Sequence, residues 1–153
     1  SEMSEVNFIK LNEIKYGSDQ YKETVKLRSK ILRTPLGLQF SKKELNEENN
    51  QFHLVCLRND KIIACLVLKP HSESKVQMRQ VAVAKAFRKK GIGRLLMVFA
   101  ENFCRKQHYR KIILHARYNV VDFYKKFGYS IKGSSFLEIG LKHYPMEKEL
   151  LKS

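Results

Sequence analysis

The sequence is poor in cysteine, in acidic residues and in long apolar runs. Its 153 residues contain three cysteines, Cys56, Cys65 and Cys104, none of which lies in a CxxC pair. An odd number of cysteines without that spacing indicates neither a disulfide framework nor a zinc cluster, so we expect reduced thiols and no metal site. No apolar run approaches the roughly 18 residues needed to cross a bilayer, so no membrane-spanning helix and no membrane partner are predicted.

Proline and glycine are also scarce, with 3 and 7 residues. Because no Pro/Gly/Ser-rich linker, repeat or low-complexity stretch divides the chain, residues 1–153 are predicted to form a single domain. The hydrophobic fraction of 43% is high enough for a packed core and too high for a disordered chain. The first residues, SEMSEVNFIK, lack the basic and apolar regions of a signal peptide, and we therefore expect a cytoplasmic protein.

Acidic residues are outnumbered two to one, since 30 Lys and Arg face 15 Asp and Glu, giving a net charge of +15. Residues 85–132 contain 13 of the basic residues and only Glu101 and Asp122, a local balance of 13 − 2 = +11. A field of that sign attracts anions such as nucleic acid, a phosphorylated metabolite or a polyphosphate cofactor. A solvated basic face on a soluble protein is the alternative, and composition alone does not choose between them.

The first half of the chain predicts a strand, two helices and three more strands. A strand is expected over residues 6–11, followed by a helix from Ser18 or Asp19 to about Arg33, where Pro35 ends it. Ser41 and Glu44 have the spacing of a capping box at the start of a short second helix. Strands over residues 53–58 and 62–69 form a predicted hairpin, and a further strand covers residues 75–83.

The second half predicts a helix after Gly93, a strand, a short helix and a closing pair of strands. In the first helix the apolar residues recur with a period that buries one face; they are Ile92, Leu95, Leu96, Phe99, Phe103 and Cys104. The segment KIILHA, residues 111–116, is typical of an interior strand, and a short helix around Tyr124 ends at Gly128. The element order is therefore β-α-α-β-β-β-α-β-α-β-β, an α+β fold.

The most informative segment is the basic glycine turn between the strand at residues 75–83 and the helix that follows. Gly91 and Gly93 lack a Cβ, so a phosphate can approach the backbone amides at the positive end of the helix dipole. Four side chains add positive charge to the turn: Arg88, Lys89, Lys90 and Arg94. A Rossmann motif is excluded because position 96, where its third glycine would lie, is leucine. A P-loop is excluded because the chain has no GxxxxGK[ST] sequence. The turn therefore predicts a pyrophosphate site, with an ordinary strand-to-helix turn as the alternative.

Three segments together resemble the GNAT superfamily of acyl-CoA-dependent N-acyltransferases. They are Arg88-x-x-Gly91-x-Gly93, the strand KIILHA and NVVDFYKKFGY at residues 119–129, and the resemblance covers about residues 53–130. It implies a central, mostly antiparallel mixed sheet flanked by helices. It also implies acetyl-CoA as co-substrate and transfer of its acetyl group to a primary amine by direct attack.

The resemblance further implies the roles of individual residues. Its cofactor-binding residues are Val81, Ala82, Val83, Arg88, Lys89, Lys90, Gly91, Ile92, Gly93, Arg94, Asn119 and Tyr124. Tyr124 would lie beside the thioester sulfur as general acid, because a thiol of pKa about 8.5 leaves more readily when a phenol of pKa about 10 hydrogen-bonds to or protonates the departing thiolate. A purely structural aromatic beside Phe123 and Phe127 is the alternative for Tyr124.

The sequence departs from the family pattern at the residue expected to accept the amine proton. Many family members have glutamate at this strand position, whereas this chain has Gln77, with Arg79 beside it. The candidates that remain for the proton acceptor are His143, His115, Glu138 or a water chain. The predicted catalytic residues are therefore Tyr124 and His143.

Two other functions compete with this prediction. A basic nucleic-acid-binding module would show binding that collapses with salt. A GNAT-fold CoA sensor without turnover is compatible with the loss of the carboxylate at Gln77. For an enzyme, the basic charge favours an anionic small-molecule acceptor over a polycation, and nucleic acid is the less favoured partner. A homodimer is a possible assembly that the sequence neither predicts nor excludes.

Overall fold

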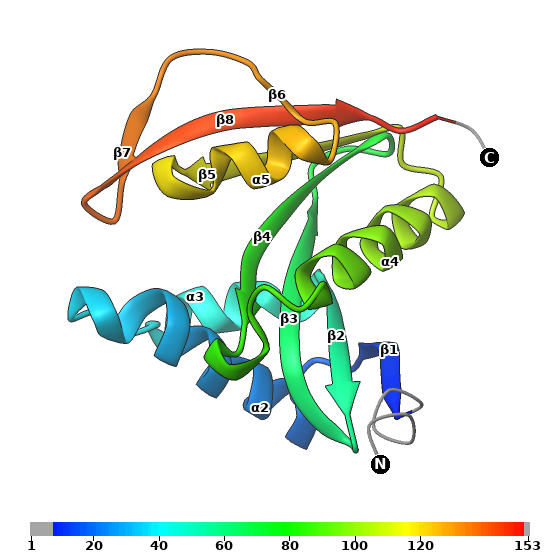
Figure 1. The fold of residues 1–153 in the computed structure, drawn as a ribbon, viewed down its shortest axis with the longest axis vertical. Coiled ribbons are helices and arrows are strands. Elements are labelled where there is room, and N and C mark those ends of the chain that lie inside the picture. Colours follow the sequence, from blue (N-terminus) through cyan, green and yellow to red (C-terminus); the bar gives the residue numbers. More distant parts are fainter. Residues whose placement is uncertain (1–7, 152–153) are drawn as a thin grey trace.

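The computed structural model describes residues 8–151, and these form one eight-stranded sheet with helices on both faces (Figure 1). The strands are β1 (Ile9–Ile14), β2 (Phe52–Arg58), β3 (Lys61–Pro70), β4 (Lys75–Val83), β5 (Lys111–Arg117), β6 (Ser130–Ile131), β7 (Phe136–Glu138) and β8 (Leu141–Glu149). The α-helices are α2 (Asp19–Arg28), α3 (Lys42–Asn46), α4 (Ile92–Lys106) and α5 (Val121–Lys126). Short turns of other helix types are η1 (Ser29–Arg33), η2 (Thr34–Leu36), η3 (Glu47–Asn50), η4 (Lys85–Phe87) and η5 (Tyr118–Val120).

The strand order is β1-β2-β3-β4-β5-β8-β6, with β7 paired to β8 outside this path. Every pair is antiparallel except β4 and β5, which are parallel. The connection between these two parallel strands runs through α4, as a parallel crossover requires. The predicted mixed, mostly antiparallel sheet is therefore confirmed.

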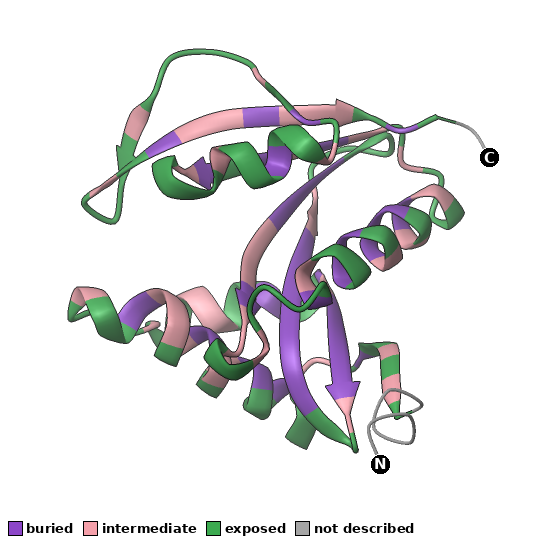
Figure 2. Cartoon of the chain, in the orientation of Figure 1, coloured by how far each residue is buried: buried purple, intermediate pink, exposed green. Residues whose placement is uncertain are grey.

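Helices cover the two faces of the sheet unequally. On one face α4 and α5 pack over the larger part of the core, which includes Leu96, Ala100 and Tyr124. On the other face α2 and η1 pack against β3 and β4 through a smaller cluster that includes Tyr21 and Cys65. Because both faces are covered, β2 and β3 are buried along most of their length, as Figure 2 shows.

The parallel pair β4–β5 separates part-way along its length, and this separation positions the site. Pairing runs from Lys75↔Lys111 to Met78↔Leu114, after which β4 continues to Val83 and β5 to Arg117. A bulge adds to the divergence, because the β3–β4 register shifts between Cys65 and Val67. Gln80, at the same place in β4, has a φ of +56°. We call the region between the unpaired ends of β4 and β5 the split.

Local signals in the sequence account for most element boundaries. Ser18 caps α2, and the Ser41–Glu44 capping box is present with both of its hydrogen bonds. The β2–β3 hairpin turns at Asn59 and Asp60, which have positive φ values of 50° and 64°. Asparagine and aspartate tolerate this conformation better than other side chains, so the predicted hairpin is confirmed.

Some boundaries differ from the sequence prediction. The first strand begins at Ile9 rather than residue 6, and residues 1–7 lie outside the described part of the chain. The helix from Asp19 is regular only to Arg28 and continues as a wider π-turn to Arg33. A two-residue strand, β6, was not predicted, because so short an element has no periodicity to read.

The prediction for α4 needs two corrections. Gly91, not Gly93, is the residue at the N-cap, so Gly93 lies inside the first helical turn. Leu95 is 43% exposed rather than buried, whereas Met97 is fully buried. The face of α4 that packs on the sheet therefore includes Met97 in place of Leu95.

Candidate active site

The glycine turn at the end of β4 leaves helical amides without a side-chain cap. After Val83 the chain passes through η4 to Lys89, with φ +60°, and to Gly91, with φ +79°, where α4 begins. Gly91 is the N-cap and has no side chain with which to bond the first-turn N–H groups. A Cβ built on Gly91 would meet no protein atom within 4 Å. The turn thus presents free donors and open space at the positive end of a 15-residue helix.

The four basic side chains of the turn are exposed and lack acidic partners. Arg88 donates from Nε to the carbonyl of Val83 at 3.4 Å, while the Arg94 guanidinium lies 5.4 Å from the ring centroid of Phe127. Within residues 8–151, Arg88, Lys89, Lys90 and Arg94 form no ion pair with a carboxylate. Their charge is therefore available to an anion.

The last residues of β4 have one unpaired backbone edge. Ala82 and Val83 pair with Cys65 and Ala64 of β3 on one side. On the other side β5 has already separated from β4, so this edge faces the split. An extended ligand can hydrogen-bond to such an edge as an added strand does. The edge leads directly into the glycine turn.

Tyr124 lies on α5 and is buried, with 8% of its surface exposed. Its ring packs edge-on against Phe123 at 5.3 Å and against Tyr129 at 5.8 Å, between ring centroids. Its hydroxyl has no hydrogen-bond partner among the described residues, unlike that of Tyr129, which donates to Glu101 at 3.0 Å. Burial raises the pKa of Tyr124 well above its ordinary value of 10, so the phenol keeps its proton at neutral pH.

Three residues that were candidates for the amine's proton acceptor are brought together next to the unpaired end of β5. Glu138 on β7 contacts His115 on β5, with 3.2 Å between Oε1 and Nδ1. The same carboxylate lies 3.6 Å from Nε2 of His143 on β8. The β7–β8 register pairs Glu138 with Leu141, and the β5–β8 register pairs Arg117 with His143. Together the two registers place His115, Glu138 and His143 on one face of the sheet.

The two histidines of this cluster differ in their surroundings. His143 is buried, and its Nδ1 donates to the carbonyl of Leu141 at 2.9 Å while Nε2 faces Glu138. His115 is exposed, and only its Nδ1 has a partner, so Nε2 is free within the described residues. The ring of His115 packs edge-on against Phe136 at 4.9 Å. Of the two, His115 has the nitrogen that a substrate can reach.

A family model described as an acetyltransferase (GNAT) domain matches residues 19–150, nearly the whole chain. The chain belongs to this family. The GNAT resemblance found in the sequence is thereby confirmed.

Known relatives of this GNAT domain agree with the observed fold. The uncharacterized protein YyaT of Bacillus subtilis (strain 168) is 28% identical over 74 residues, which are 48% of this chain and 50% of YyaT. The chain thus spans about half the length of the curated relatives it matches. The crystal structure of a candidate N-acetyltransferase from Lactobacillus plantarum superposes with a TM-score of 0.83 at 23% identity, covering 94% of this chain and 99% of that one.

A second structure comes from Elizabethkingia anophelis and is a GNAT family acetyltransferase solved with acetyl-CoA bound. It superposes on this GNAT domain with a TM-score of 0.74 at 19% identity, covering 94% of this chain and 99% of that one. At these identities the two superpositions establish a shared fold.

Two predicted site positions in this GNAT domain have surroundings that the sequence did not reveal. Gln77 is buried, and its side-chain oxygen lies 2.8 Å from Nε2 of the exposed His71, a residue that no motif had singled out. Asn119 lies in η5 on the surface and makes no side-chain hydrogen bond within residues 8–151. The Gln77–His71 contact depends on the β3–β4 connection, which has no motif signal.

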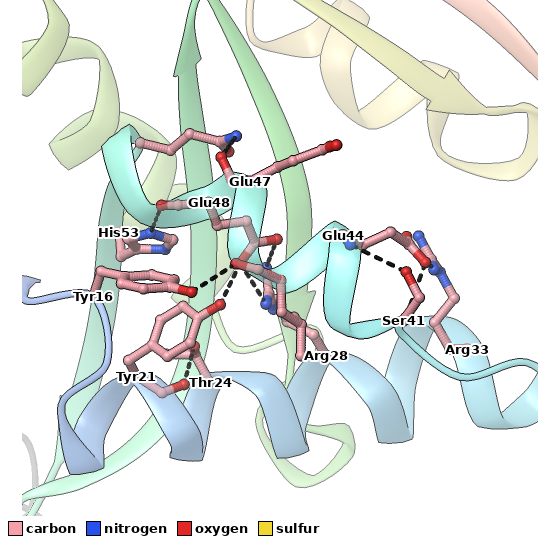
Figure 3. A network of polar contacts seen from close by, with 12 residues as sticks. Tyr16, Tyr21, Thr24, Arg28, Arg33, Ser41, Glu44, Glu47, Glu48 and His53 are labelled. Atoms are coloured by element: carbon pink, nitrogen blue, oxygen red, sulfur yellow. Dashed lines mark hydrogen bonds and ion pairs between the residues drawn. The ribbon is translucent and has the colours of Figure 1, made fainter.

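A buried polar network joins helix α2 to the sheet (Figure 3). Arg28 binds both oxygens of Glu48, at 3.0 and 2.9 Å, and the Tyr21 hydroxyl donates to the same carboxylate at 2.7 Å. His53 contacts the backbone carbonyl of Glu48 through Nε2 at 3.0 Å. The network joins α2, η3 and β2, and Arg28 is the last residue of α2 before the turn η1.

The three cysteines of this GNAT domain are buried and unpaired. Burial raises the pKa of the Cys56 thiol to about 11 and those of Cys65 and Cys104 to about 12. Neutral, inaccessible thiols are poor nucleophiles, which argues against a covalent acyl-cysteine.

Within residues 8–151 no helix is long and apolar enough to cross a bilayer. In the same part of the chain, His, Cys, Asp and Glu side chains form no group of three suited to a metal ion.

Proposed function

We propose that this GNAT domain transfers an acetyl group from acetyl-CoA to a primary amine of a small molecule, by direct attack of the amine on the thioester. The observation that carries the proposal is the continuity of the unpaired β4 edge with an uncapped helix N-terminus surrounded by unpaired cations. The unpaired β4 edge suits an extended amide-containing arm, and the uncapped helix N-terminus with its cations suits a pyrophosphate. Family membership and the acetyl-CoA bound to the Elizabethkingia anophelis protein support the same assignment.

The residues of the turn fit acetyl-CoA by their chemistry. Val81 to Val83 would bind the pantetheine arm through their backbone, and the backbone amides and cations of Arg88 to Arg94 would bind the pyrophosphate. Acetyl-CoA supplies an activated acyl group when bound. Asn119 would contact the cofactor from η5, at the start of α5.

Tyr124 is proposed to protonate the departing thiolate. Its buried phenol holds a proton at neutral pH, and its hydroxyl is not committed to another residue of the described chain. A donor without an existing partner can serve a ligand at little structural cost.

The amine must lose a proton, and the geometry favours His115 over the predicted His143 as its acceptor. Both ring nitrogens of His143 face oxygen atoms, which suits a positioning role. The Nδ1–H of His115 can donate to Glu138, which leaves the Nε2 lone pair free. This arrangement of base and orienting carboxylate is that of many activated sites.

The acceptor is proposed to carry negative charge, and the reaction to occur in the cytoplasm. A net charge of +15 disfavours polycationic acceptors such as polyamines. The buried free thiols are compatible with a reducing compartment.

Binding of acetyl-CoA is tested by a matched pair of glycine variants. Gly91 and Gly17 both have φ of +79° and open space where a Cβ would lie, so Gly91→Val and Gly17→Val carry similar backbone strain. Only in Gly91→Val would the branched side chain enter the proposed phosphate position. We expect isothermal titration to show affinity weakened by about tenfold or more in Gly91→Val and little change in Gly17→Val. Equal affinities in the two folded variants would place the phosphates elsewhere.

Turnover is tested by CoA-thiol release across a panel of amines, with mass spectrometry of the product. Release that requires an amine supports the enzyme. Binding of acetyl-CoA without release would indicate a sensor, and absence of binding would leave the nucleic-acid module.

The proton route is tested by His115→Gln and His143→Gln. Because a general base contributes about 10² to 10⁴ in rate, we expect His115→Gln to lower kcat by roughly this factor and to change the acidic limb of the pH–rate profile. His143→Gln should lower kcat less and keep the shape of that limb. The opposite ranking would return the role to His143.

A further inference from the structure

Arg117 is a charged residue in the unpaired end of β5, and the proposed reaction does not use it. It is the last residue of β5 and lies three positions past Leu114, the last residue paired with β4. It follows His115 by two residues, so both side chains lie on the same face of β5. Arg117 is therefore close to the proposed proton acceptor and on its side of the sheet.

The Arg117 side chain crosses from β5 to the helical layer on that face. Its Nη2 donates to the backbone carbonyl of Leu32 in η1 at 2.7 Å, a contact between residues 85 positions apart. This is its one hydrogen bond within residues 8–151, although a guanidinium has five N–H donors. Arg117 is half-buried, so these remaining donors are partly shielded from bulk water.

The charge of Arg117 lacks a dedicated counter-ion. Burial lowers the pKa of Arg117, and the positive charge of Arg33 lowers it further. Glu138 raises the pKa of Arg117, but the two oxygens of Glu138 already face His115 and His143. Arg33 differs from Arg117 because it is paired with Glu44 at 3.1 Å. Within the described residues, Arg117 therefore has no carboxylate bonded to it.

We propose that Arg117 binds an oxyanion carried by the acceptor, a carboxylate or a phosphate set apart from the reacting amine. This inference rests on the proposed function and assigns a substrate class to it. A guanidinium fork matches the two oxygens of either group and binds them through charged hydrogen bonds. A neutral acceptor would leave the shielded donors of Arg117 unused.

The test compares amines that carry an oxyanion with counterparts that lack it, using acetyl-CoA and the full chain. The pairs are β-alanine with β-alaninamide, for a carboxylate, and glucosamine 6-phosphate with glucosamine, for a phosphate. We expect kcat/KM to favour the anionic member of at least one pair in the wild-type protein, and the pair that responds identifies the oxyanion. A panel in which neither anionic member is preferred overturns the inference.

Arg117→Gln should reduce that preference by roughly 10- to 100-fold, mainly by raising KM for the anionic amine, because it removes a charged hydrogen bond. Arg117→Lys, which keeps the charge but not the fork, should retain part of the preference. Arg110→Gln is the matched control, since this exposed arginine precedes the other end of β5 and its loss changes the net charge equally; it should leave the preference unchanged.

The outcomes separate this inference from the proposed function. A preference that survives Arg117→Gln, or that falls equally in Arg110→Gln, overturns the role of Arg117 while CoA release from the wild type still supports the enzyme. Failure of the wild-type protein to bind acetyl-CoA overturns both.

Discussion

At the scale of single residues, the hydroxyl of Tyr124 allows rate and stability to be separated. It has no partner in the described chain, so Tyr124→Phe removes no hydrogen bond and should leave the melting temperature nearly unchanged. If the hydroxyl protonates the thiolate, kcat should fall by roughly 10² to 10⁴ with little change in acetyl-CoA affinity. Turnover and thermal unfolding are measured on the same preparations. A kcat within about threefold of wild type would leave positioning of the amine as the main source of catalysis.

Tyr129→Phe is the matched control for this prediction. Tyr129 is also buried, but its hydroxyl donates to Glu101, so the same substitution leaves a buried carboxylate with one donor fewer. We expect a loss of about 1–3 kcal/mol in unfolding free energy with kcat largely retained. Equal loss of turnover in both variants would point to disturbed packing around α5.

The residues of the glycine turn could be predicted from the sequence, whereas the partners of Glu138 could not. Glycine conformation and cationic charge are local properties, so Gly91 and its basic neighbours can be recognised in the sequence as the candidate for a phosphate site. The cluster of Glu138 with His115 and His143 depends on the register of β7 with β8 and of β8 with β5. A one-residue shift in either pairing would turn these side chains to opposite faces.

At the scale of elements, the ion pair between Arg28 and Glu48 joins α2 to η3 and should be costly to break. Both side chains are buried, with 0% and 5% of their surface exposed. Glu48→Gln removes the countercharge of a buried guanidinium, so we expect a loss of about 3–5 kcal/mol in unfolding free energy. Urea denaturation measures it. The double variant Arg28→Met/Glu48→Gln should recover part of the loss, because it leaves no unpaired buried charge.

The exposed pair of Lys10 and Asp60 provides the control at this scale. These side chains are 65% and 89% exposed and 3.9 Å apart, so Asp60→Asn should cost less than about 1 kcal/mol. Asparagine also tolerates the positive φ of 64° at this position. A similar cost for Asp60→Asn and Glu48→Gln would contradict the dependence on burial.

Element boundaries were predictable where a local chemical signal sets them. The capping box at Ser41 and the hairpin at Asn59 depend on residues within four positions of each other, and both are present. The widening of α2 into a π-turn and the divergence of β4 from β5 have no local signal of this kind, and they lie where residues far apart in the sequence meet, as in the bond from Arg117 to Leu32. No periodicity in the sequence encodes such contacts.

At the scale of the whole molecule, charge is divided between a basic turn and ion pairs elsewhere. The carboxylates that form ion pairs in the described chain all contact residues outside the turn, such as Glu48 with Arg28 and Glu147 with Lys111. The cations at Arg88 to Arg94 are thus not neutralised by the fold. Attraction of an anion to the turn should therefore depend on this local charge rather than on the total of +15.

The salt dependence of acetyl-CoA binding tests that distinction. Raising the ionic strength from about 0.1 to about 1 M shortens the Debye length from about 10 to about 3 Å, which screens exposed charges such as Lys89 and Lys90. We expect isothermal titration to show weaker binding at high salt, and a shallower dependence in the variant Lys89→Gln/Lys90→Gln. The variant Lys22→Gln/Lys26→Gln removes the same net charge from exposed positions on α2 and should keep the wild-type slope. If both variants changed the slope equally, total charge would govern the attraction, as expected for a non-specific polyanion binder. A difference confined to Lys89 and Lys90 would instead assign the attraction to the turn at the start of α4, where free helical amides accompany the cations.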